Sequence, residues 1–160
     1  MDVFRAMQRQ QVQPNLITYN ALISACEKGK DVATAVDVFR AMQEQQVQPN
    51  VITYSALISA CEKGDDLTSA IDVFRAMQRQ HVHPDVITYN ALISACEKGK
   101  DATTAVDVFR AMREQQVLPN VITYTALISA CEKGNDLTSA MDVFRAMQEQ
   151  HVHPDLEAPP

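Results

Sequence analysis

The sequence predicts an all-α fold: a right-handed α-α superhelix, or solenoid, of tandem helix-turn-helix repeats. The first observation behind this prediction is a 35-residue period, which separates Tyr19, Tyr54, Tyr89 and Tyr124. The second is that the apolar residues inside each period follow the spacing of a helix. Periods of this size are typical of solenoids, in which each repeat buries its apolar face against its neighbours.

The period divides the chain into complete repeats 16–50, 51–85, 86–120 and 121–155, which are called units 1 to 4 below. Residues 1–15 resemble the second helix of a further repeat, and residues 156–160 form a tail. Unit 1 differs from unit 3 at five positions but from unit 2 at eleven, which indicates that a 70-residue pair was duplicated. Because no polar capping helix is visible at either end, we expect exposed apolar surface and self-association there.

The first helix of each unit is predicted by an apolar stripe. In unit 1, Tyr19, Leu22, Ile23 and Cys26 are spaced at i, i+3, i+4 and i+7, which places them on one face of a helix of about 11 residues. The sequence EKG then ends the helix. We expect Gly29 to take the left-handed conformation just beyond the helix, and the preceding lysine suits the negative helix end.

The second helix begins and ends with recognisable signals. Asp31 is a good N-cap residue, and an apolar stripe follows at Val32, Ala35, Val36, Phe39 and Met42. The sequence QVQPN ends this helix after about 14 residues, because Pro49 disfavours helical conformation in the residue before it.

Composition excludes several functional classes. The formal net charge is −6, from 14 basic and 20 acidic residues. This charge argues against a broad electrostatic grip on nucleic acid or on an anionic membrane, although a narrow basic track on one face remains possible. No apolar run approaches the roughly 18 residues that cross a bilayer, and the N-terminus lacks the apolar segment of a signal peptide.

Neither metal binding nor catalysis is indicated. The cysteines occupy one repeated position and form no C-x-x-C pair, so we expect small buried core residues at Cys26, Cys61, Cys96 and Cys131. Two H-V-H sequences begin at His81 and His151, two repeats apart, which corresponds to about 20 Å and is too far to share an ion. There is no glycine-rich phosphate loop and no Ser–His–acid set. The sequence predicts a protein that is not an enzyme and needs no cofactor or metal.

The repeat resembles that of the pentatricopeptide repeat family, P-type, over residues 16–155. The resemblance rests on the 35-residue length, the start V-I-T-Y-N-A-L-I, the turn C-E-K-G, the second-helix pattern A-x₃-F-x₂-M and the closing P-N or P-D. It implies a superhelix whose first helices line a concave groove, where single-stranded RNA lies at one base per repeat.

An alternative is the tetratricopeptide repeat, a protein-binding repeat of about 34 residues. Ala35-x₃-Phe39 fits its pattern, but Ile23 and Cys26 replace the glycine and the second aromatic residue of its first helix. A protein-interaction scaffold with no role in RNA binding therefore stays open as a second hypothesis.

One position varies inside the sequence ITYNALISACEKG and its three further copies: the residue after the tyrosine. The resemblance implies that this residue and the last residue of the unit read one base. The implied pairs are Asn20 with Asn50, Ser55 with Asp85, Asn90 with Asn120, and Thr125 with Asp155. The family's rule assigns Ser or Thr with Asp to guanine, and Asn with Asn to cytosine or uracil. The implied RNA site is 5′-pyrimidine-G-pyrimidine-G-3′.

Elementary chemistry agrees with this rule, because a carboxylate only accepts hydrogen bonds and so suits the N–H edge of guanine, whereas an amide both donates and accepts. The alternative is drift among equivalent residues, since Asn, Asp, Ser and Thr all suit helix starts and turns.

Two further sets are implied by the resemblance. Aliphatic residues that sandwich each base correspond to Ile17, Ile52, Ile87 and Ile122. Lysines that approach the RNA backbone correspond to Lys28, Lys63, Lys98 and Lys133. On spacing alone, the isoleucines would be assigned to the core and the lysines to favourable charges at helix C-termini. The family also implies action in chloroplasts or mitochondria, on the processing, stability or translation of transcripts. No targeting segment is visible, and the chain has the look of a fragment.

Overall fold

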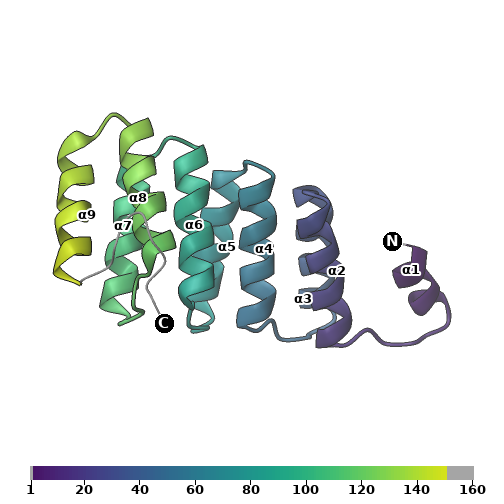
Figure 1. The fold of residues 1–160 in the computed structure, drawn as a ribbon. Coiled ribbons are helices and arrows are strands. Elements are labelled where there is room, and N and C mark those ends of the chain that lie inside the picture. Colours follow the sequence, from purple (N-terminus) through teal and green to yellow (C-terminus); the bar gives the residue numbers. More distant parts are fainter. Residues whose placement is uncertain (1, 151–160) are drawn as a thin grey trace.

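A computed structural model describes residues 2–150 of the chain, and the regular elements of this part are all helices. In chain order they are α1 (Asp2–Arg9), α2 (Leu16–Lys28), α3 (Val32–Glu44), α4 (Val51–Lys63), α5 (Leu67–Arg79), α6 (Val86–Lys98), α7 (Ala102–Glu114), α8 (Val121–Lys133) and α9 (Leu137–Glu149). The first helices α2, α4, α6 and α8 stand side by side in one layer, with α3, α5 and α7 behind them (Figure 1). The predicted all-α superhelical repeat fold is confirmed.

Side-chain caps set the start of each helix from α2 to α9. The last residue of one unit is the N-cap of the first helix of the next unit, as Asn50 is for α4 and Asp85 is for α6. Asp31 caps α3, as predicted, by accepting from the backbone N–H of Thr34. The complete helices of both kinds have 13 residues, rather than the expected 11 and 14. The first helix is longer than expected because its cap is the residue immediately before the unit.

The core lies between consecutive units. The tyrosine of each first helix is fully buried, and Tyr54, Tyr89 and Tyr124 each meet the phenylalanine of the preceding second helix edge to face. Ring centroids are 5.6 Å apart for Phe39 and Tyr54, and 5.9 Å apart for Phe74 and Tyr89. The predicted stripe of the second helix needs one correction. Val38 is buried and Val36 is only half-buried, because Val38 is one turn from both Ala35 and Met42.

The glycine of the EKG turn does not take the predicted conformation. Gly29 has φ −83°, and the following residue, Lys30, adopts the left-handed conformation instead, with φ 56°. At Gly64, Gly99 and Gly134 the glycine is required for space. A Cβ on Gly134 would lie 2.8 Å from Ala102 Cβ, at the start of the preceding second helix. The same close approach joins Gly64 to Val32 and Gly99 to Leu67.

The cysteines are buried and unpaired, as expected for core residues. Burial raises the pKa of the Cys61 and Cys96 thiols to about 12, with a smaller contribution from the following Asp66 and Asp101 carboxylates. Such thiols are protonated and unreactive at neutral pH. Within residues 2–150, no group of His, Cys, Asp or Glu side chains is arranged to hold a metal ion. The second H-V-H sequence lies outside the described residues.

Some apolar surface is exposed on the outermost helices, at Val3, Leu137 and Met141. Self-association through such surface stays a prediction. In the same described part of the chain, none of the helices is long and apolar enough to span a membrane.

The glycine contact gives a test of how the units pack. Gly134→Ala should lower the free energy of unfolding by about 1–3 kcal/mol, because the added methyl group meets the rigid Ala102 Cβ. Gly29→Ala is the matched control: its Cβ would meet nothing closer than the Ala25 carbonyl oxygen at 3.5 Å. Urea unfolding of both variants measures the difference, and equal effects at the two glycines would contradict the packing role.

Candidate nucleic-acid interface

The two predicted reading positions of a unit meet at the N-terminal ends of the first helices. The residue after the tyrosine lies in the second turn of its helix, and the last residue of the unit caps the neighbouring first helix. They are 30 residues apart in the sequence, yet they are brought together because α2 and α4 lie side by side. The same arrangement recurs between α4 and α6 and between α6 and α8.

In units 1 and 3 the predicted partners contact each other directly. Asn20 Nδ2 donates to Asn50 Oδ1 at 3.4 Å, and Asn90 Nδ2 donates to Asn120 Oδ1 at 3.2 Å. Two of the four implied pairs are therefore adjacent in space, with polar atoms in contact.

In unit 2 the two residues are joined through a third. Ser55 Oγ lies 2.5 Å from Thr88 Oγ1, and Thr88 Oγ1 donates to Asp85 Oδ1 at 2.9 Å. Unit 4 is described only in part: Thr125 occupies the equivalent place on α8, and Asp155 lies outside the described residues.

Helix capping uses one of the two terminal polar atoms of the last residue of each unit and leaves the other atom available. Asn50 Oδ1 accepts from the backbone N–H of Thr53 at 3.1 Å, and Asp85 Oδ1 accepts from that of Thr88 at 3.0 Å. Because a backbone N–H can only donate, the amide of Asn50 must turn its oxygen toward the helix and its Nδ2 away. The remaining atom is therefore a hydrogen-bond donor in Asn50 and an acceptor, Oδ2, in Asp85.

A surface hollow collects the predicted residues of unit 2. It has a volume of about 250 Å³, and Ser55 and Asp85 line it together with Ile52 of the same unit and Ile87 of the next. Glu27, from α2, also contributes to the lining. A reading pair and two flanking aliphatic side chains are thus found in one place.

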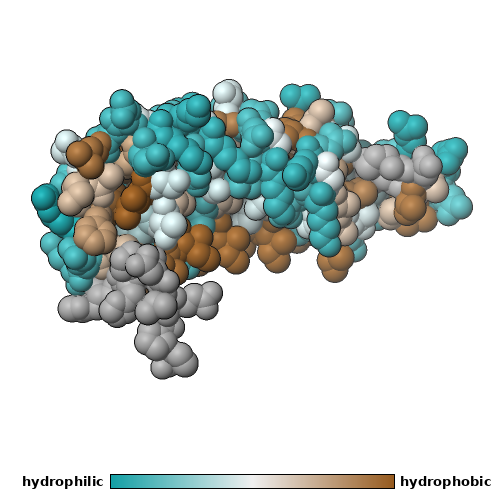
Figure 2. Space-filling view, turned by 45° about the horizontal axis from the view of Figure 1, so that its top comes forward, coloured by the Kyte–Doolittle hydropathy of each residue, from teal (hydrophilic) through white to brown (hydrophobic). Residues whose placement is uncertain are grey.

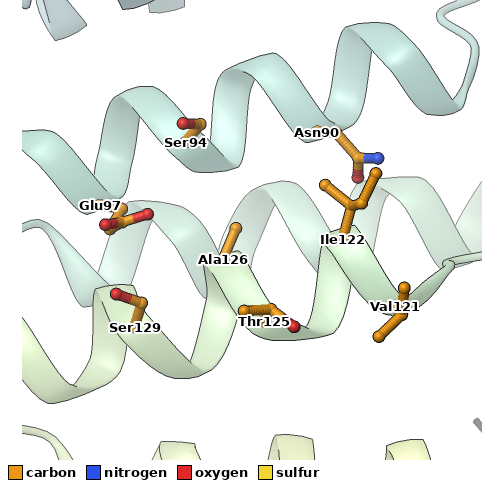
Figure 3. Close-up of a pocket in the computed structure, with 8 residues that line it drawn as sticks. All are labelled: Asn90, Ser94, Glu97, Val121, Ile122, Thr125, Ala126 and Ser129. Atoms are coloured by element: carbon orange, nitrogen blue, oxygen red, sulfur yellow. The ribbon is translucent and has the colours of Figure 1, made fainter. Parts of the chain in front are cut away.

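A second hollow, of about 440 Å³, lies between α6 and α8 (Figure 3). Asn90 and Ile122 lie next to each other at one end of it, and Glu97 lies toward the other end. Thr125 lines the same hollow from α8. Glu97, Ile122 and Thr125 stand two repeats after Glu27, Ile52 and Ser55 of the first hollow, so the two hollows are equivalent sites, one at unit 2 and one at unit 4.

The isoleucines do not belong to the core. Their exposed fractions are 76% for Ile17, 59% for Ile52, 63% for Ile87 and 61% for Ile122. Hydrophobic side chains recur along one long edge of the molecule in Figure 2. A regular row of large exposed aliphatic groups at one face is unusual in a protein surface and indicates a binding function.

The lysines form a ladder of ion pairs with glutamates of the preceding unit. The Nζ–Oε distances are 3.0 Å for Lys63 with Glu27, 3.2 Å for Lys98 with Glu62, and 2.6 Å for Lys133 with Glu97. Lys28 makes no ion pair within residues 2–150. The paired lysine side chains remain 37–41% exposed, so each pair stabilises the fold by at most about 1 kcal/mol.

Sequence reasoning missed two participants. One is the threonine before the tyrosine in units 2 to 4 (Thr53, Thr88 and Thr123), whose hydroxyl contacts the reading residues of the preceding unit. Its signal was the spacing N-x-x-T or D-x-x-T of a helix cap. The other is the role of the glutamates in the ladder. Their partners are 36 residues away, and that pairing follows only from the packing of neighbouring first helices.

Models of three known repeat families match the chain. The model of the pentatricopeptide repeat domain matches residues 2–63 and 72–134. The PPR repeat family model matches residues 119–157, and the PPR repeat model matches residues 52–82. Since the first match alone covers most of the chain, the protein belongs to the pentatricopeptide repeat family.

Solved structures share the fold at low sequence identity. The PPR domain of Arabidopsis thaliana protein-only RNase P 1, in complex with tRNA, matches with a TM-score of 0.83 and 20% identity, over 95% of this chain and 80% of that one. PPR10 in complex with an 18-nt psaJ RNA element matches with a TM-score of 0.75 and 23% identity, over 94% of this chain and 22% of that one. PPR10 from maize matches with a TM-score of 0.75 and 25% identity, over 96% of this chain and 22% of that one. The chain thus spans less than a quarter of PPR10. A comparison with curated proteins gave no significant match.

Proposed function

We propose that the chain binds single-stranded RNA along the N-terminal ends of its first helices, with one base at each unit. The observation that carries this proposal is the hollow of unit 2, where Ser55 and Asp85 lie together with Ile52 and Ile87. A flat apolar base that enters between two aliphatic side chains is shielded from water, and its polar edge then meets the reading pair. The RNA complexes of two proteins with the same fold support the proposal.

The polarity of the atom left over from helix capping supports the guanine assignment for unit 2. Asp85 offers Oδ2, which can only accept, so the matching edge is the N1–H and N2–H₂ edge of guanine. Adenine offers an acceptor at N1, and two acceptors facing each other cannot form a hydrogen bond.

Units 1 and 3 offer the opposite polarity. Asn50 and Asn120 use their oxygens as caps and present Nδ2 donors. Donors suit the carbonyl oxygens of a pyrimidine, and cytosine also has an acceptor at N3. These features support 5′-pyrimidine-G-pyrimidine-G-3′ as the bound sequence, read 5′ to 3′ from unit 1 to unit 4.

The proposed role is that of a reader in organellar RNA processing, stability or translation, with the chain acting as a binding module. Lys28, Lys63, Lys98 and Lys133 are assigned to the RNA backbone, where phosphates compete with the glutamates for the last three. Four such contacts correspond to a slope of only about −3 in log affinity against log salt, because each contributes roughly −0.7.

The capping geometry predicts that base preference can be switched. In the double variant Asp85→Asn with Asp155→Asn, the oxygen at position 85 keeps its capping role and Nδ2 replaces Oδ2, so adenine should replace guanine at unit 2. Asp155 lies outside the described residues, and its substitution applies the same base rule to unit 4. Fluorescence anisotropy at low salt, with labelled RNAs carrying UGUG or UAUA among adenines, should give a preference for UGUG in the wild type. The variant should instead prefer UAUA. In each protein the preferred RNA should bind on the order of tenfold more tightly than the other.

The control is Asp37→Asn with Asp142→Asn, which makes the same charge change on exposed residues of second helices. Wild-type preference for UGUG with no reversal in the reading variant would contradict the assignment of Asp85 and Asp155. If neither RNA binds, two fused copies of the chain separate weak binding from none. If the fused copies also fail to bind either RNA, the protein-interaction scaffold is the favoured function.

The ion-pair ladder makes a separate prediction. Replacing Glu27 and Glu97 by Gln releases Lys63 and Lys133, and replacing Glu62 by Gln leaves Lys98 with its longer ion pair to Asp65 at 3.6 Å. RNA affinity should therefore rise severalfold, and the salt dependence should become steeper, by up to the roughly −0.7 per contact of a single strand. Salt titrations of RNA binding measure both quantities. The control is Glu44→Gln with Glu114→Gln and Glu149→Gln, which changes the net charge equally at second-helix ends. An equal gain in the control would mean that net charge alone matters.

A further inference from the structure

A buried threonine joins the reading residues at each of three unit junctions. Thr53, Thr88 and Thr123 are the third residues of α4, α6 and α8, and each is 0% exposed. In the described part of the chain they are the three polar residues that the core buries. Each hydroxyl comes from the unit that follows the reading pair it touches.

In unit 2 this contact has a direction. Thr88 has one hydroxyl proton, which it donates to Asp85 Oδ1 at 2.9 Å, because a carboxylate can only accept. The proton in the 2.5 Å contact between Ser55 and Thr88 must then come from Ser55. Ser55 is left with lone pairs only toward the hollow, and Asp85 Oδ2 has the same polarity. The pair thus offers two acceptors, which matches the two adjacent N–H groups of guanine.

In units 1 and 3 the threonine sets the orientation of an amide. Thr53 Oγ1 donates to Asn20 Oδ1 at 2.5 Å, and Thr123 Oγ1 donates to Asn90 Oδ1 at 2.5 Å. Each hydroxyl also lies 3.0 or 3.1 Å from the N-cap oxygen of Asn50 or Asn120, and we assign its single proton to the shorter contact. With its oxygen held in this way, the amide of Asn20 turns Nδ2 toward Asn50, to which it donates. Both reading residues then present donors.

We propose that Thr53, Thr88 and Thr123 are positioning residues for base selection, each fixing the hydrogen-bond polarity of the reading pair in the preceding unit. This inference rests on the proposed RNA-binding function and deepens it: the selectivity of units 1, 2 and 3 depends on a hydroxyl supplied by the unit that follows. A purely structural threonine would affect stability alone.

The chain contains its own control for the structural role. Thr18 is the equivalent residue of α2, and its hydroxyl bonds with the N-cap residue Asn15, both donating to Asn15 Oδ1 at 3.1 Å and accepting from the Asn15 backbone N–H at 3.3 Å. It contacts none of the implied reading residues. Thr18→Val therefore removes a capping hydroxyl with no effect on a reading pair.

The test compares Thr88→Val with the wild type on UGUG, UAUG and UGUA RNAs at low salt. The second nucleotide meets unit 2 and the fourth meets unit 4, so the fourth serves as an internal control. In the variant, preference for guanine at the second nucleotide should fall from on the order of tenfold to under about threefold, with preference at the fourth unchanged. Thr88→Ser should restore it, and Thr18→Val should leave both preferences intact.

Equal selectivity of the wild type and Thr88→Val at the second nucleotide would overturn the inference and leave the proposed function standing. If the wild type binds all three RNAs equally well, both the inference and the proposed base-selective function are wrong. A measurement without RNA tests the geometry alone: the side-chain amide NMR signals of Asn20 and Asn90 should move toward those of a free amide in Thr53→Val and Thr123→Val, respectively. Unchanged signals would also overturn the inference.

Discussion

The interaction on which the structure depends is the hydrogen bond from the first turn of each first helix to the last side chain of the preceding unit. At α4 and α6, Asn50 and Asp85 accept from backbone N–H groups that have no partner inside their helix. This bond fixes where each helix begins and holds consecutive units in register. It also turns the second polar atom of the same side chain toward the solvent-facing end of the helix layer. One contact thus serves folding and positions a group that can recognise a ligand.

Packing keeps these ends aligned along the array. The tyrosine and phenylalanine rings lock consecutive units together, and the glycine after α4, α6 and α8 lets the preceding second helix approach closely. Because every junction uses nearly the same residues, the reading positions recur at equal intervals. The variable residues Asn20, Ser55, Asn90 and Thr125 can change without disturbing the stack, since the burial is carried by their neighbours.

Much of the fold could be predicted from the sequence, because a strict period, helical apolar spacing and capping residues all indicate the same helix pairs. The role of the glycine could not, since the space around Gly134 depends on a residue of the preceding unit, Ala102. For the candidate site, the reading positions followed from the family resemblance, and their proximity follows from the packing. The contact between the threonine hydroxyls and the reading residues was not predicted, because Thr53 looks like an ordinary helix-cap residue until α2 is placed beside it.

The most direct test is a crystal structure of the chain with an RNA that carries UGUG among adenines. The guanine to inspect is the second nucleotide of UGUG, which we expect at unit 2. There Asp85 Oδ1 should remain on the Thr88 backbone N–H while Oδ2 lies within hydrogen-bond distance of guanine N1, with the base between Ile52 and Ile87. A guanine bound elsewhere, or an Asp85 side chain that leaves the helix end to reach it, would contradict this mechanism.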